Sequence, residues 1–132
     1  MKIRVLLLLL LTFFAKTLSA GEPTDVSLIQ LIANPKEYDG KLVRVGGVVN
    51  FEFEGDAIYL HKDDIRYCLT KNGLWLDTQS MQKKKLNGKY VSVEGIFNAT
   101  SKGHMGLWSG TLQRISRMGL LPEREEKSTR QP

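Results

Sequence analysis

The sequence contains a single cysteine, Cys68, among its 132 residues. An internal disulfide is therefore excluded, even in an oxidising compartment that permits such bonds. Cys68 lies in the apolar stretch IRYCL, which predicts a buried thiol. A reactive thiol would require a lowered pKa and a cationic neighbour. A hydrophobic core alone must hold the fold, which is feasible at about 100 residues.

Recognisable motifs for phosphate, dinucleotide or nucleophilic chemistry are also missing. The chain has no P-loop, no dinucleotide fingerprint and no nucleophile elbow. Its two histidines, His61 and His104, have no partner at an established metal-ligand spacing. The stretch 61–64 and the pair His104-Met105 contain side chains of types that bind metals, but two ligands do not form a metal site. We therefore expect a protein that is not an enzyme and that has neither a cofactor nor a metal.

The net charge of the chain is small when residues 1–20 are left out. The chain has 19 basic and 14 acidic side chains, and residues 1–20 hold three of the basic ones and none of the acidic ones. The remainder has 19 − 3 = 16 basic side chains against 14 acidic ones, a net charge of +2. Lys83, Lys84 and Lys85, with Lys89 nearby, form a short basic run that is more typical of a solvated face than of a phosphate track. We expect no nucleic-acid partner.

The N-terminus has the three-part layout of a secretory signal peptide. Lys2 and Arg4 precede the apolar run VLLLLLLTFFA, and small residues follow up to Ala20. The apolar run is shorter than the roughly 20 residues that span a bilayer. We predict cleavage after Ala20, give or take one residue, and a periplasmic or secreted protein without membrane insertion after cleavage. An uncleaved membrane anchor is the alternative.

The rest of the chain predicts one helix followed by strands. Thr24 or Asp25 is a suitable N-cap, apolar residues then recur at helical spacing, and Pro35 ends the helix. Alternating apolar residues and turn signals then predict five strands. These strands cover about residues 43–54, 57–61, 74–77, 91–97 and 107–116.

A partial internal repeat connects two of the predicted strands. Residues 39–47 read DGKLVRVGG and residues 87–95 read NGKYVSVEG. The shared pattern combines a tight turn at Asp-Gly or Asn-Gly, alternating valines on one strand face and a later glycine at which the strand bends. The spacing of 87 − 39 = 48 residues is too long and isolated for a solenoid. It predicts two long strands that enter one curved sheet in the same way.

These features predict a mainly β fold, a small five-stranded OB-like barrel with an N-terminal helix. The stretches DGKLVRVGGVV, IYLHKDD, LWLD, NGKYVSVEGIF and GHMGLWSGTLQRI resemble OB-fold domains of small secreted bacterial proteins over about residues 26–117. An open β-sandwich or another small barrel is the alternative. The predicted organisation is a signal peptide over 1–20, the barrel domain over 21–117 and a flexible charged tail over 118–132.

The resemblance implies a ligand surface over the second and third strands, flanked by the loops 54–56 and 98–104. Because Ile58 and Leu60 are predicted to face the inside of the barrel, we predict that Tyr59 and His61, which alternate with them, face solvent. The two tryptophans also fit a core position at the ends of the barrel, which is the commoner role. The ligand-binding candidates are Tyr59, His61, Trp75, His104 and Trp108.

We therefore expect a non-enzymatic binding module for a peptide, a glycan or a protein partner. The alternative is a protein inhibitor or immunity-type protein that blocks another protein. In that case the charged loops 52–56 and 63–66 matter more than the aromatic residues.

Overall fold

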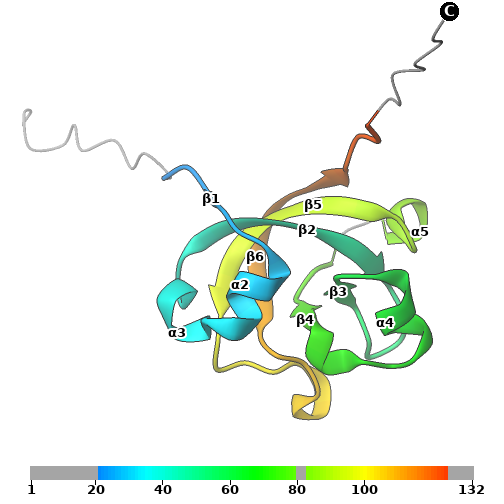
Figure 1. Cartoon of the computed structure of the whole chain (residues 1–132), viewed down its shortest axis with the longest axis horizontal. Coiled ribbons are helices and arrows are strands. Elements are labelled where there is room, and N and C mark those ends of the chain that lie inside the picture. Colours follow the sequence, from blue (N-terminus) through cyan, green and yellow to red (C-terminus); the bar gives the residue numbers. More distant parts are fainter. Residues whose placement is uncertain (1–20, 80–82, 125–132) are drawn as a thin grey trace, which may run out of the picture.

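The computed structural model describes residues 21–79 and 83–124, in which one mixed sheet closes into a barrel (Figure 1). The sheet order is β1-β2-β3-β4-β6-β5, and the additional pairing of β2 with β5 closes it. Five strands thus form the barrel, and the short β1 is an additional edge strand that pairs with β2. This arrangement confirms the predicted fold class. The strands are β1 Thr24–Asp25, β2 Leu42–Asn50, β3 Ala57–Tyr59, β4 Gly73–Leu76, β5 Tyr90–Asn98 and β6 Thr111–Leu120.

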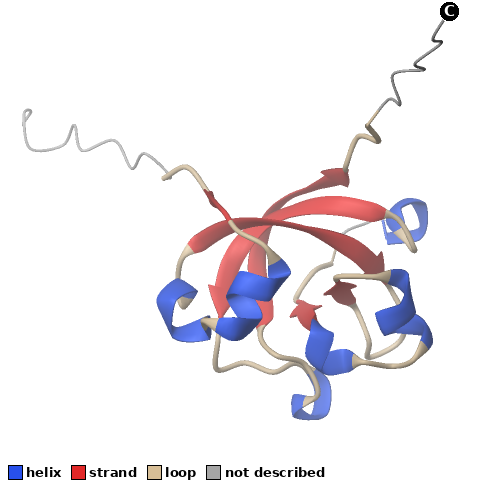
Figure 2. Cartoon of the chain, in the orientation of Figure 1, coloured by secondary structure: helices blue, strands red, loops and turns tan. Residues whose placement is uncertain are grey.

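Short helices occupy the connections between the strands (Figure 2). They are the α-helices α2 Leu28–Ala33, α3 Pro35–Tyr38, α4 Lys62–Arg66 and α5 Lys83–Leu86, and the 3-10 helices η1 Thr70–Asn72 and η2 His104–Gly106. The predicted helix caps at Thr24 or Asp25 are wrong, because these two residues form β1. Ser27 is the N-cap of α2: its Oγ accepts from the Gln30 N–H at 3.1 Å, and its own N–H donates to Gln30 Oε1 at 2.9 Å.

The barrel interior is filled by the apolar face of the two long strands, as the alternation predicted. Val43, Val45, Val91, Val93 and Phe97 are each at most 1% exposed. Leucines from α2 close over this core and belong to the same cluster of buried residues. The main core thus combines one face of β2 and β5 with the apolar side of a short, capped helix.

The two copies of the repeat face each other across a local two-fold axis. β2 and β5 are antiparallel, with Val45 opposite Val93. Asp39 Oδ1 accepts the N–H of Ala99, and the equivalent Asn87 Oδ1 accepts the N–H of Phe51, both at 2.8 Å.

The turns of the two copies match as well. Gly40 and Gly88 take φ of 75° and 74°, which explains the glycine in each copy. The offset of 48 residues also relates α3 to α5, since 35 + 48 = 83. The prediction that both copies enter the sheet in the same way is therefore confirmed.

The predicted bounds of several strands, among them 43–54 and 107–116, differ from the structure. β2 ends at Asn50, so Phe53 lies in the loop 51–56 with its side chain 92% exposed instead of facing the core. β6 begins only at Thr111 and continues to Leu120, which pairs with Val91, so the ordered strand extends past the predicted domain end at 117. The predicted signal peptide over 1–20 and the end of the predicted tail, 125–132, lie outside the described residues.

Candidate functional site

The predicted ligand face of β3 and β4 is covered by the chain itself. Tyr59 and Trp108 are each only 3% exposed and, with Val48 and Ala57, form a second cluster of buried residues. Trp75 is half-buried and packs against this cluster. The prediction that Tyr59 faces solvent is therefore wrong. Trp108, which precedes β6, takes the core role that was the commoner expectation.

Three of the five predicted residues do come together, in a buried arrangement. Trp108 Nε1 donates to Tyr59 Oη at 3.1 Å. The rings of Trp75 and Trp108 meet edge to face, with centroids 4.9 Å apart and an interplanar angle of 66°. Burial raises the pKa of the Tyr59 hydroxyl, while the hydrogen bond from Trp108 lowers it by a smaller amount. Tyr59 therefore serves as a neutral acceptor inside the second cluster.

The loop 99–110 lies over this cluster and is fixed there by hydrogen bonds. The N–H of Ser109 donates to the Gly73 carbonyl at 3.2 Å, and its Oγ donates to the Lys71 carbonyl at 2.6 Å. Lys102 Nζ donates to the Ser109 carbonyl at 2.7 Å. Gly103 approaches the ring of Trp75 so closely that an added Cβ would lie 2.8 Å from it. The sheet face that OB-folds offer to ligands is thus filled by a tightly seated loop.

The two histidines lie apart from the aromatic trio. His61 is exposed and precedes α4, where its N–H donates to Asp64 Oδ2 at 2.9 Å. Asn72 Nδ2 donates to the other oxygen, Oδ1, at 2.8 Å, so the buried Asp64 has a structural role in the turn between α4 and η1. Within residues 21–79 and 83–124 no three His, Cys, Asp or Glu side chains gather closely enough to hold a metal ion.

His104 connects the two loops at one rim of the barrel. Its Nε2 lies 3.2 Å from Glu54 Oε2, which ties η2 to the loop 51–56. The sequence neighbours of this pair are apolar and exposed: Phe53 at 92%, Met105 at 81% and Leu107 at 43%. We call Phe53, Met105 and Leu107, with the Glu54–His104 pair, the loop rim.

Two residues of the loop rim have backbone conformations that residues other than glycine rarely adopt. Glu54 has φ of 55° and Met105 has φ of 54°, and both are in the left-handed region without being glycine. Such residues cost about 1–3 kcal/mol each and persist where the surrounding structure enforces them. The sequence could not reveal the loop rim, because Phe53 continues the alternation of β2 and nothing local shows that the strand ends at Asn50.

Cys68 differs from its predicted environment. Its side chain is exposed, and its φ of 53° places it in the left-handed region between α4 and η1. The prediction of a buried thiol from the apolar neighbours is therefore wrong. Those neighbours, Tyr67 and Leu69, are themselves 64% and 46% exposed.

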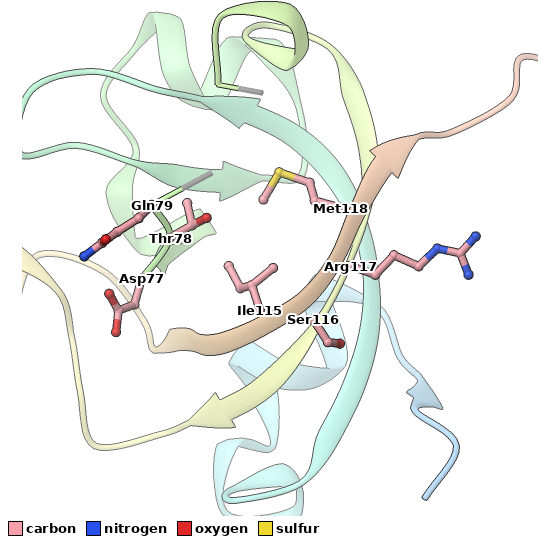
Figure 3. Close-up of a pocket in the computed structure, with 7 residues that line it drawn as sticks. All are labelled: Asp77, Thr78, Gln79, Ile115, Ser116, Arg117 and Met118. Atoms are coloured by element: carbon pink, nitrogen blue, oxygen red, sulfur yellow. The ribbon is translucent and has the colours of Figure 1, made fainter. Parts of the chain in front are cut away.

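Two depressions lie away from the predicted face. One, of about 520 Å³, lies between β6 and the segment 77–79, and Ile115 and Met118 point into it while Ser116 and Arg117 point away (Figure 3).

A second depression is lined by the turn 87–90, by Lys62 and by the residues at and after the end of β6, and has a volume of about 750 Å³. It does not overlap the face that the sequence predicted.

Comparisons with known proteins leave the function open. No protein-family model and no curated protein matches the chain. A solved structure described as a putative aspartyl-tRNA synthetase from Leishmania major Friedlin matches with a TM-score of 0.41 and 9% identity. The match covers 79% of this chain and only 22% of that chain. In the described part of the chain, none of the helices is both long and apolar enough to cross a bilayer.

Proposed function

We propose that this chain is a non-enzymatic periplasmic binding module that recognises a protein or peptide partner through the loop rim. The observation that carries the proposal is the exposure of Phe53 and Met105, 92% and 81%, on two loops that the contact between His104 Nε2 and Glu54 Oε2 brings together. Exposed apolar side chains that gather on one surface mark interaction sites, whereas isolated ones need no explanation. The periplasmic location rests on the signal-peptide pattern of residues 1–20.

The position of the loop rim supports this role. The loops 51–56 and 99–110 correspond to the two loops that flank the ligand surface of OB-folds. Here the sheet between them is filled by Tyr59 and Trp108, so a partner that reaches this side of the barrel meets the loop rim first. Burial of a large apolar side chain contributes about 1.5–3 kcal/mol, so the exposed side chains of Phe53 and Met105 are suitable anchors.

The geometry favours a protein or peptide over a glycan. Sugar rings stack on exposed aromatic faces, and two of the three aromatic residues expected to provide them, Tyr59 and Trp108, are 3% exposed. The loop rim instead offers a phenylalanine, a methionine and a leucine. Methionine in particular is flexible and polarizable, and adapts to varied apolar partner surfaces. The backbone of the rim is held by the Glu54–His104 contact and by the hydrogen bonds of the loop 99–110, which limits the entropy lost on binding.

Binding to selected peptides tests the proposal. Residues 21–132 are used to select peptides from a random phage-displayed library, and the dissociation constants of the selected peptides are measured by calorimetry. The double variant F53S/M105S is expected to weaken binding by about 30-fold or more, which corresponds to the loss of at least one interface anchor of about 2 kcal/mol.

The matched control is I29S/Y67S, which removes two side chains that are 60% and 64% exposed outside the loop rim. This control is expected to bind within twofold of the wild type. Equal binding by F53S/M105S and the wild type contradicts the proposal. Recovery of one stoichiometric protein whose activity the chain blocks would assign the inhibitor role to the same rim.

A further inference from the structure

A second surface combines unpaired positive charge with exposed apolar side chains. The depression of about 750 Å³ is lined by Lys62, Lys89, Tyr90, Leu120 and Leu121, with Glu123 at its edge. We call these five residues, together with Lys84 and Lys85 of the adjoining α5, the lysine groove. In Figure 1, α5 and the end of β6 lie at the upper right, whereas η2 lies at the bottom. Lys84 also lines a neighbouring depression of about 390 Å³ together with Phe53 of the loop rim.

The cations of the lysine groove lack partners of their own. Lys62, Lys84, Lys85 and Lys89 are exposed and form no ion pair with any described residue. Two other described cations are paired: Lys83 contacts Asp56, and Arg44 contacts Asp25 and Glu94. The nearby carboxylates are Asp63, which follows Lys62 in the sequence, Glu123 in the groove, and Glu52 and Asp56, which line a neighbouring depression with Lys84. Asp56 is paired with Lys83, so four unpaired lysines stand against three unpaired acids.

Apolar side chains stand among these lysines. Tyr90, Leu120 and Leu121 are 42%, 52% and 40% exposed and line the same depression as Lys62 and Lys89. A tyrosine or leucine that reaches the acyl boundary while lysine ammonium groups contact phosphates is the pattern of a protein surface that binds at the bilayer interface.

We propose that the lysine groove attaches the protein to the surface of a bilayer that contains anionic phospholipid. Lysine ammonium groups beside exposed tyrosine and leucine side chains fit a bilayer surface, which offers headgroup phosphates and an acyl boundary side by side. All four free cations in the groove are lysines. The attachment is peripheral, and it leaves η2, with Met105 of the loop rim, open to a partner.

Vesicle binding tests the proposal with residues 21–132, which contain the closed barrel and every residue of both buried clusters. The wild type is sedimented with vesicles of phosphatidylglycerol and phosphatidylcholine in equal parts, and with phosphatidylcholine alone. We expect binding to the anionic vesicles that falls as salt rises. Each lysine near an anionic surface contributes about a fivefold preference, so K84Q/K89Q is expected to weaken binding about 25-fold.

The internal repeat provides the matched control. Lys36 and Lys41 occupy the positions equivalent to Lys84 and Lys89, since 36 + 48 = 84 and 41 + 48 = 89. K36Q/K41Q removes the same charge from the same local structure and is expected to bind anionic vesicles within twofold of the wild type. Substitution L120S/L121S, which keeps every charge, is expected to weaken vesicle binding as well.

Three results would overturn the proposal. Equal weakening by K84Q/K89Q and K36Q/K41Q would show a general charge effect. Equal binding to both kinds of vesicle would remove the role of the lysines. Binding to a soluble polyglutamate peptide, without binding to anionic vesicles, would assign the lysine groove to acidic protein segments instead. The rim variant M105S, which leaves Phe53 beside Lys84 unchanged, is expected to bind vesicles normally, so this proposal and that of the loop rim fail separately.

Discussion

Gly103 allows the loop 99–110 to lie against Trp75, and its replacement by alanine should detach that loop. Its φ of 70° and ψ of −162° belong to a region that is essentially restricted to glycine, where other residues cost about 1–3 kcal/mol. A Cβ at this position would also lie 2.8 Å from three atoms of Trp75. We expect G103A to lower the free energy of unfolding by about 2–4 kcal/mol.

Gly106 provides the matched control for this prediction. It has the same φ of 70°, but a Cβ there would meet nothing within 4 Å. G106A should therefore cost only the left-handed backbone term of about 1–2 kcal/mol.

Denaturant unfolding followed by tryptophan fluorescence suits both variants, because the only two tryptophans of the chain, Trp75 and Trp108, belong to this region. Equal destabilisation by G103A and G106A, with unchanged fluorescence of the folded state, would refute the close packing of the loop 99–110 against Trp75.

Three further predictions follow from the buried cluster, the free thiol and the main core. Y59F leaves Trp108 Nε1 buried without its acceptor and should cost about 1–3 kcal/mol in denaturant unfolding. Because the pKa of Tyr59 is raised in the fold, its contribution should be constant below about pH 10 and decline at higher pH, a decline that Y59F should lack. Cys68 should react with a maleimide in the folded protein as fast as an unfolded control; protection in the native state would contradict its exposure. F97A should cost about 3–5 kcal/mol, measured by the same unfolding assay, because Phe97 is fully buried.

The sequence predicted the barrel well where the pattern was long and repeated. The alternating valines of the two repeat copies identified the inner faces of β2 and β5, and Asp39-Gly40 and Asn87-Gly88 identified their turns. These features are local, so they can be read from neighbouring residues. The two-fold arrangement of the copies required the pairing of Val45 with Val93, which no local pattern contains.

The candidate site was predicted less well, for a physical reason. Alternation correctly separated Tyr59 from Ile58, but it indicates only that two side chains point to opposite faces of a strand. Whether the second face meets water depends on what covers it, and here the loop 99–110 does. The exposure of Phe53 could not be predicted either, because the end of β2 depends on where its partner strand stops, which no local pattern shows.

The most direct test of the loop rim is the location of a bound peptide on the protein. Backbone amide chemical shifts of isotopically labelled residues 21–132 are recorded while a library-selected peptide is added. We predict that the largest changes occur in the loop 51–56 and around His104–Gly106, and that the indole signal of Trp108 stays unchanged. Large changes at Tyr59 and Trp108 with small ones at Phe53 and Met105 would contradict the account, because the peptide would then have displaced the seated loop and bound the sheet.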